Sequence, residues 1–156
     1  MYRRILVPLD GSERAEQALL HACHLARSSG AELLLVHVVE PPVVAAPVGE
    51  PAAKSAAPQL ISLEDALKQA QLEARAYLEK IRSQLEDAGI PCQVRLEQGG
   101  VVERIADAAE TQGVDAIVMA SHGRGASGDA SFGSVAVGIL FRVESALLVI
   151  RSRRGP

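Results

Sequence analysis

Near the N-terminus stands the apolar segment Ile5-Leu6-Val7-Pro8-Leu9, followed directly by Asp10-Gly11-Ser12. A short apolar run of this kind is typical of a strand that is buried on both faces. Ser12 is a good N-cap for a helix, and Gly30 stands where that helix should end. The apolar face of this helix is formed by Ala15, Ala18, Leu19, Ala22 and Leu25. A buried strand that leads into an amphipathic helix indicates an α/β fold.

Strand and helix patterns alternate along the rest of the chain. Strands are predicted at 33–39, at 93–97 (half-exposed, near an edge), at 116–120 and at 146–150. Helices are predicted from Ser62, where Ser62 and Asp65 resemble a capping box, to Gly89, from 101 to 112, and near 134–143. This alternation predicts a five-stranded parallel sheet with helices on both faces, a Rossmann-like α/β arrangement.

Residues 40–60 are rich in proline and alanine and carry no periodic pattern, so we expect a mobile surface loop there. The chain has 156 residues and no internal repeat. It is long enough to bury one core, and we predict a single domain over residues 1–156.

Composition narrows the classes of function. A formal net charge of −3 argues against non-specific binding to nucleic acid. Cys23 and Cys92 show no CxxC spacing, which fits a reducing compartment. No signal-peptide pattern and no apolar run of the roughly 20 residues needed for a membrane span are found, so a cytoplasmic protein is predicted. His21 and His24 have no companion ligands in the pattern, and no metal site is predicted.

The connection from Met119 to Ser134 is the most informative segment. It leaves a central strand, is rich in Gly and Ser, and ends where a helix begins. It is roughly fifteen residues long, whereas most loops between a strand and a helix have about 2–6 residues. Glycine lets backbone amides approach an anion closely, and a helix N-terminus adds positive potential. The segment predicts a phosphate site, with an ordinary flexible connection as the alternative. Ser134 either donates its hydroxyl or caps the helix.

Three blocks resemble the universal stress protein family. They are the segment 5–12, the segment 35–39, and Gly123 followed after nine residues by Gly133-Ser134. The resemblance covers nearly the whole chain. It implies an adenine nucleotide alpha hydrolase-like fold with strand order 3-2-1-4-5 and an adenine-nucleotide site.

The resemblance assigns the two ends of that site. Asp10 matches the acidic residue that, in the family, faces adenine and ribose. Val38 matches the residue of the second strand whose backbone meets the adenine edge. The residues implied to bind the nucleotide are Pro8, Leu9, Asp10, Val38, Met119, Ala120, Gly123, Gly133, Ser134 and Val135. From the residues alone, Asp10 is equally a turn residue bonded to Ser12, and His122 either touches phosphate or is solvated.

Two positions depart from the family pattern. Ala120 stands where a glycine is expected, and the spacer 124–132 lacks the usual leucines and most of the basic residues. Asp129 within it would repel a triphosphate unless it points away or helps to hold Mg²⁺. The adenosine end is therefore the firmer half of the prediction. We expect a Gly133→Asp change to abolish phosphate binding and to leave the fold intact.

Three functions follow in order of preference. The first is a regulatory module of the stress response that binds ATP or AMP, with Mg²⁺, and acts through nucleotide-dependent conformation and contacts with an unidentified client protein. The second is a nucleotide-free homodimeric interaction protein. The third is a slow ATPase, which ranks last because no nucleophile–base pair and no P-loop lysine are present. No catalytic residue is predicted.

The end of the chain points to self-association. The last helix carries Val137, Gly138 and Phe141 where relatives commonly have Glu or Arg, which indicates either a contact surface or deeper packing against the sheet. In the family the final strand commonly pairs antiparallel with its mate. A homodimer through Ala146–Ile150, or a higher oligomer, is expected.

Overall fold

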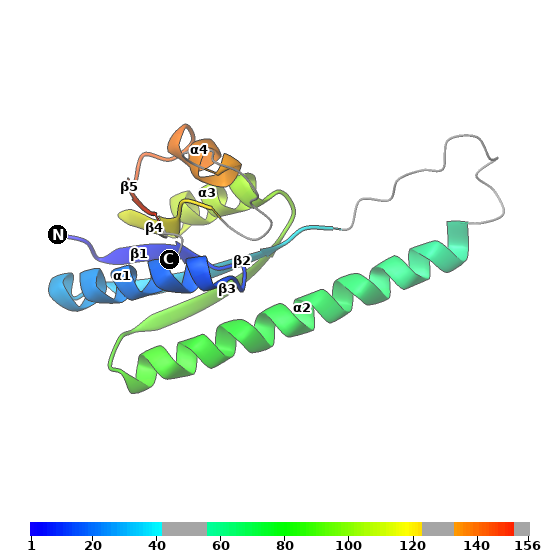
Figure 1. Ribbon diagram of the computed structural model, residues 1–156, viewed down its shortest axis with the longest axis horizontal. Coiled ribbons are helices and arrows are strands. Elements are labelled where there is room, and N and C mark those ends of the chain that lie inside the picture. The colour runs from blue at the N-terminus through cyan, green and yellow to red at the C-terminus, as the bar shows by residue number, and fades with distance from the viewer. Residues whose placement is uncertain (42–55, 123–132, 152–156) are drawn as a thin grey trace, which may run out of the picture.

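The computed structural model describes residues 1–41, 56–122 and 133–151, the side chains of 56–61 excepted. Its strands are β1 (Arg4–Pro8), β2 (Glu32–Val39), β3 (Cys92–Gln98), β4 (Ala116–Ala120) and β5 (Ala146–Ile150). They form one parallel sheet in the order β3-β2-β1-β4-β5 (Figure 1). The predicted fold class and strand order are confirmed.

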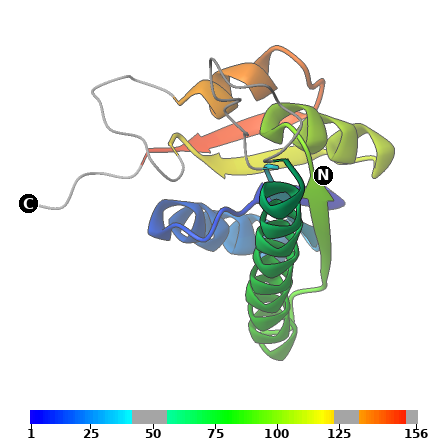
Figure 2. The same ribbon diagram turned by 90° about the vertical axis from the view of Figure 1, so that its right-hand side faces the viewer.

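Four helices cover the two faces of the sheet. They are α1 (Glu13–Ser29), α2 (Ala56–Asp87), α3 (Val101–Thr111) and α4 (Ser134–Leu140). Figures 1 and 2 show α1 and α2 on one face and α3 and α4 on the other. Within the described residues, none of these helices has the length and apolar content needed to cross a bilayer.

The alternation of side chains along the strands divides the core into two layers. Leu33 and Leu35 of β2 pack with residues of α1 and α2, whereas Leu34 and Val36 pack with residues of α3 and α4. Both faces of β2 are thus buried, which explains its nearly unbroken apolar sequence.

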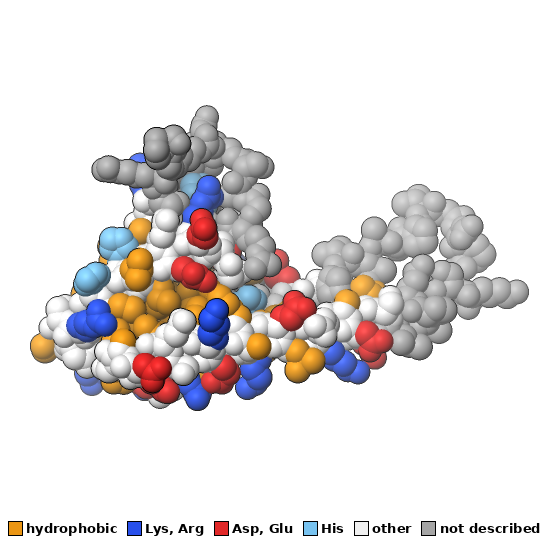
Figure 3. Space-filling model, turned by 60° about the horizontal axis from the view of Figure 1, so that its bottom comes forward, with side chains coloured by type: hydrophobic (Ala, Val, Ile, Leu, Met, Phe, Trp, Pro, Cys, Tyr) orange, Lys and Arg blue, Asp and Glu red, His pale blue; other side chains and the backbone are white. Residues whose placement is uncertain are grey.

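On the molecular surface, hydrophobic side chains gather between charged ones on the side of α2, which comes forward in Figure 3.

Local capping signals set both ends of α1. The hydroxyl of Ser12 accepts a hydrogen bond from the amide of Ala15 at 3.2 Å. Gly30 follows the helix with a φ of 71°, a left-handed conformation that glycine adopts at low cost. The predicted start and end of this helix are confirmed.

The predicted start of α2 is wrong. The helix begins at Ala56, so Ser62 lies inside it and residues 56–60 of the predicted loop are helical. Alanine is the best helix former, and Pro58 falls in the first turn, where its missing N–H leaves no hydrogen bond unmade. Residues 42–55 of that loop lie outside the described residues. The N-terminal part of α2 extends beyond the strands (Figure 1).

The helix α4 is shorter than predicted and exposes apolar side chains. It ends at Leu140, and the amides of Arg142 and Val143 both bond to the carbonyl of Ile139. Ala136 and Ile139 are buried against the sheet. The exposed fractions are 41% for Val137, 59% for Leu140 and 83% for Phe141. Val137 and Phe141 therefore do not pack against the sheet.

The carboxylate of Asp115 joins the starts of β1 and β4. Its Oδ2 accepts hydrogen bonds from the amides of Arg3 and Arg4 at 2.7 and 2.8 Å. These two bonds are the main reason that the pKa of Asp115 lies below its ordinary value. The ionised form is therefore favoured in the folded protein.

We expect Asp115→Ala to lower the free energy of unfolding at pH 7 by about 1–2 kcal/mol, because two backbone donors lose a charged acceptor. Since the folded pKa is depressed, this contribution is present above the ordinary pKa and is lost as the pH falls through the lowered one. Urea unfolding of both proteins from pH 7 to pH 3 should show the difference shrinking. A constant difference would contradict this role.

Candidate functional site

A cavity of about 1010 Å³ lies at the carboxyl end of the sheet. The ends of β1, β2 and β4 form its floor, and residues from all four helices form its walls. Ligand sites of open α/β sheets lie at this position, beyond the carboxyl ends of the strands.

Three neighbouring strands end with side chains on the same side of the sheet. Val38 and Met119 pack with the core layer of α3 and α4, and Pro8 lies two residues after Leu6, which belongs to the same layer. All three line the cavity. Their apolar surface is suited to one face of a flat aromatic ring.

Asp10 both lines the cavity and shapes the turn after β1. Its Oδ1 accepts hydrogen bonds from the amide of Ser12 at 3.0 Å and from the Ser12 hydroxyl at 2.6 Å. The same hydroxyl caps α1 through Ala15. The turn-residue interpretation is therefore confirmed, and the carboxylate stands at the cavity as well.

The segment after β4 returns to the same place at the start of α4. The amide of Gly133 donates to the carbonyl of Ser121 at 2.7 Å, which joins the two ends of the connection. A Cβ on Gly133 would lie 2.8 Å from that carbonyl oxygen, so glycine is needed for close approach of the backbone. Its φ of −71° is ordinary. Any side chain at Gly133, including that of the predicted Gly133→Asp change, therefore forces a local shift of the backbone at this junction.

His122 stands beside this junction and lines the cavity. Its Nδ1 lies 3.1 Å from the hydroxyl of Ser121, a buried residue. Its Nε2 is shielded from solvent and has no hydrogen-bond partner among the described residues. The imidazole therefore belongs to the wall of the site and is not a freely solvated side chain.

The cavity gathers every predicted site residue that the structure describes: Pro8, Leu9, Asp10, Val38, Met119, Ala120, Gly133, Ser134 and Val135. Gly123 and the spacer 124–132 lie outside the described residues. Segments far apart in the sequence thus meet at one place, as the crossover topology requires.

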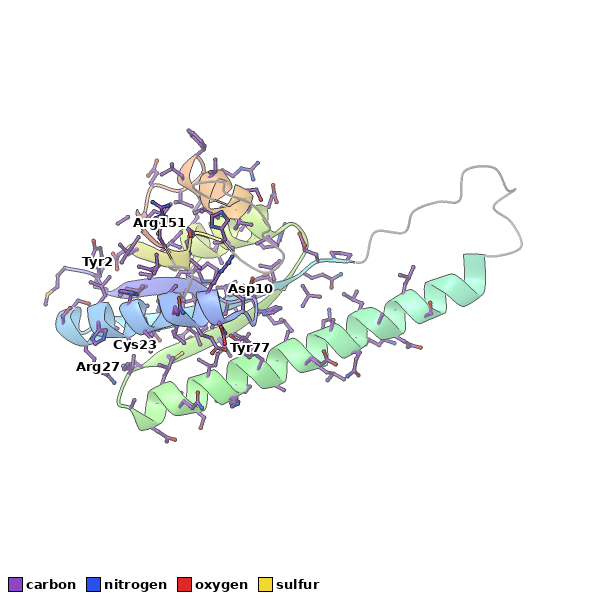
Figure 4. All side chains as sticks on the ribbon, viewed as in Figure 1. Tyr2, Asp10, Cys23, Arg27, Tyr77 and Arg151 are labelled. Carbon is purple, nitrogen blue, oxygen red and sulfur yellow. The ribbon has the colours of Figure 1, made fainter. Side chains whose placement is uncertain are left out.

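Sequence reasoning missed the walls that α2 and α3 contribute. Tyr77, labelled in Figure 4, lies on α2. Its hydroxyl donates to Glu16 of α1 at 3.2 Å, and its ring meets that of His37 edge-on with centroids 6.3 Å apart. Tyr77 and His37 line the cavity together with Glu73, Val101, Val102 and Glu103. No local motif marks these residues, because only the packing of the helices brings them to the site.

Four acidic side chains line the cavity: Asp10, Glu40, Glu73 and Glu103. Glu103 forms an ion pair with Arg142 of the segment after α4 at 2.7 Å. A backbone hydrogen bond and this contact hold the pKa of Glu103 below its ordinary value. Within the described part of the chain, no three His, Cys, Asp or Glu side chains are grouped as a metal site requires.

Known proteins resemble this chain over nearly its whole length. A profile described as "Universal stress protein family" matches residues 1–151. A universal stress protein of Thermus aquaticus is 35% identical over 153 residues, covering 97% of this chain and all of the relative. Universal stress protein MJ0577 of Methanocaldococcus jannaschii is 29% identical over 160 residues, covering 98% of this chain and 97% of the relative.

Solved structures show the same fold. The structure of MJ0577 superposes with a TM-score of 0.77 at 28% identity and covers 99% of both chains. Two more distant structures are described as complexes, one with cAMP (TM-score 0.67, 18% identity, 96% and 97% covered). The other, from Archaeoglobus fulgidus, is a complex with dAMP (TM-score 0.62, 22% identity, 95% and 97% covered). With a family match that spans almost the whole chain, the protein belongs to the universal stress protein family.

Proposed function

We propose that the protein is a regulatory module that binds an adenine nucleotide, ATP or AMP, in the cavity at the carboxyl end of the sheet. The observation that carries this proposal is the meeting of the two predicted halves of the site. The adenosine half (Asp10, Val38) and the phosphate half (Gly133, Ser134, Val135) line one cavity. Structural neighbours that bind cAMP and dAMP agree with it.

Each half has a chemical role. The apolar strand ends pack against adenine, and the carboxylate of Asp10 accepts hydrogen bonds from ribose hydroxyls. At the other end, Gly133 lets the backbone approach a phosphate, and the hydroxyl of Ser134 donates to it. Mg²⁺ accompanies a triphosphate, bound through its phosphates and one or two carboxylates.

The regulatory role rests on surfaces that neighbour the site. The strand β5 is an edge of the sheet, and α4 exposes Val137, Leu140 and Phe141. We propose that β5 pairs with its mate in a homodimer and that α4 offers its apolar side chains to a client protein or a second dimer. We place the protein in the cytoplasm, in the stress response, with nucleotide hydrolysis slow and incidental.

A second candidate function is a nucleotide-free homodimeric interaction protein. The composition of the spacer 124–132 favours it, since that segment lacks the leucines and most of the basic residues that are usual in the family. The two functions separate in one experiment. Purified protein is denatured, released small molecules are resolved by anion exchange, and fresh protein is titrated calorimetrically with AMP and with ATP plus Mg²⁺. Released nucleotide, or binding below millimolar concentration, supports the first function. The absence of both supports the second.

Asp10→Asn tests the adenosine half. An asparagine Oδ1 still accepts from Ser12, so the turn and the cap of α1 should persist while the charged acceptor for ribose is lost. We expect about tenfold weaker binding of AMP, measured by calorimetry, with an unchanged urea midpoint. Asp107→Asn, on the exposed face of α3, is the matched control. Equal affinities for Asp10→Asn and the parent would exclude Asp10 as a ligand.

A further inference from the structure

The charged side chains on the described wall of the cavity are all acidic. They come from four different elements: Asp10 follows β1, Glu40 follows β2, Glu73 lies on α2 and Glu103 in the first turn of α3. They therefore reach the cavity from four separate segments of the chain. A ligand that enters meets negative charge from several directions.

The acidic residues differ in how far a neighbour compensates their charge. Glu103 is paired with Arg142 at 2.7 Å, so its charge is largely offset. Glu73 accepts a hydrogen bond from the side-chain amide of Gln69 at 2.9 Å, a neutral donor that leaves the negative charge in place. Glu40 is exposed directly after β2. Among the described residues, no ion pair offsets the charge of Glu40 or Glu73, which we call the rim carboxylates.

We propose that this wall selects adenine nucleotides of low charge, so that AMP binds more tightly than ATP free of Mg²⁺. The proposal rests on the adenine-nucleotide site proposed above and specifies which nucleotide that site prefers. At pH 7 a monophosphate carries a charge of about −2 and a free triphosphate about −4. Each additional ligand charge is repelled by the rim carboxylates Glu40 and Glu73, which line the same cavity as Gly133 and Ser134 of the phosphate half. One pair of like charges about 10 Å apart in water changes an affinity about twofold, and apolar walls increase the effect.

Two consequences follow from the electrostatic origin of this preference. Salt screens exposed charges beyond a Debye length of about 10 Å at 0.1 M, so the preference should weaken at high ionic strength. Mg²⁺ neutralises part of the triphosphate charge and should also weaken it. Occupancy of the site would then rise as AMP accumulates and free triphosphate falls.

Calorimetric titration of the full chain with AMP, ADP and ATP, in EDTA at about 20 mM salt, tests the proposal. Affinity should fall with each added phosphate, with AMP about tenfold tighter than ATP. In Glu40→Gln/Glu73→Gln the ratio of the two affinities should narrow by about threefold or more, mainly through tighter ATP binding. The matched control is Glu64→Gln/Glu110→Gln, which removes two exposed charges that do not line the cavity and should keep the parent ratio.

The outcomes separate this proposal from the one on which it rests. If ATP without Mg²⁺ binds as tightly as AMP or more tightly at low salt, the charge preference is overturned while the nucleotide site stands. If Glu40→Gln/Glu73→Gln prefers AMP as strongly as the control variant does, the proposed role of Glu40 and Glu73 is overturned. If no adenine nucleotide binds under any condition, the proposed function itself fails.

Discussion

Replacing Gly133 with alanine should weaken binding of an adenine nucleotide by about tenfold to a hundredfold in a protein that still folds. The new Cβ would lie 2.8 Å from the carbonyl oxygen of Ser121, a backbone atom that cannot turn away as a side chain would. The amide of Gly133 also donates to that oxygen at 2.7 Å. The two ends of the connection must therefore move apart, and Ser121, His122, Ser134 and Val135 on them line the cavity.

The magnitude follows from the cost of overpacking. Inserting a methyl group into a tight contact costs about 1–3 kcal/mol, and about 1.4 kcal/mol corresponds to tenfold in affinity. Calorimetry with AMP measures the affinity, and urea unfolding measures the stability. We expect both to fall, the affinity because the wall that holds the phosphate is displaced.

Gly30→Ala is the control for loss of stability alone. Gly30 has a φ of +71° and open space where a Cβ would stand, so alanine is strained there without touching a neighbour. It lies at the C-terminal end of α1, away from the cavity, and should cost about 1 kcal/mol in stability. Its nucleotide affinity should equal that of the parent. A Gly133→Ala protein that binds AMP as the parent does would show that the phosphate lies elsewhere.

Sequence reasoning succeeded where a structure is decided by neighbours along the chain. Ser12 and Gly30 cap α1 by local hydrogen bonding and local φ, so both ends were predictable. It failed at Ser62, where a capping signal was outweighed by the helix-forming run that begins at Ala56. A capping pattern shows where a helix is able to begin, and the residues before it decide whether it begins earlier.

The floor of the site was predictable for a topological reason, and its walls were not. Pro8, Val38 and Met119 lie within the last two residues of three adjacent parallel strands, so finding the strands already places these residues together. Tyr77 reaches the site only because the apolar stripe of α2 packs on the sheet, and its own position carries no signal.

Gly138 shows the same limit on α4. In the sequence it is one small residue in an apolar segment, yet a Cβ there would lie 2.9 Å from Val102 of α3. Its smallness lets the two helices approach, and α3 supplies Val102 and Glu103 to the cavity. The contact depends on the distance between two helices, which no local pattern specifies.

Val149→Pro should convert the proposed homodimer into a monomer. The amide of Ala146 donates to Asp115, and the carbonyl of Ile150 accepts from Ser121. In a parallel ladder alternate residues turn their backbone groups to opposite sides, so Leu147 and Val149 direct theirs away from β4 to the open edge. Proline at 149 removes an edge donor that a partner strand would use and leaves the bonds to β4 in place.

Val149→Ala separates loss of the amide from loss of the side chain. Val149 packs on the core layer of α3 and α4, and alanine gives up that packing while it keeps the N–H. Sedimentation at micromolar concentration should show the parent and Val149→Ala at the mass of two chains and Val149→Pro at the mass of one. Urea unfolding of both variants checks that they fold. If Val149→Pro remains dimeric, the copies meet elsewhere, and the exposed side chains of Leu140 and Phe141 become the next surface to test. A monomeric parent would remove the dimer from the proposal altogether.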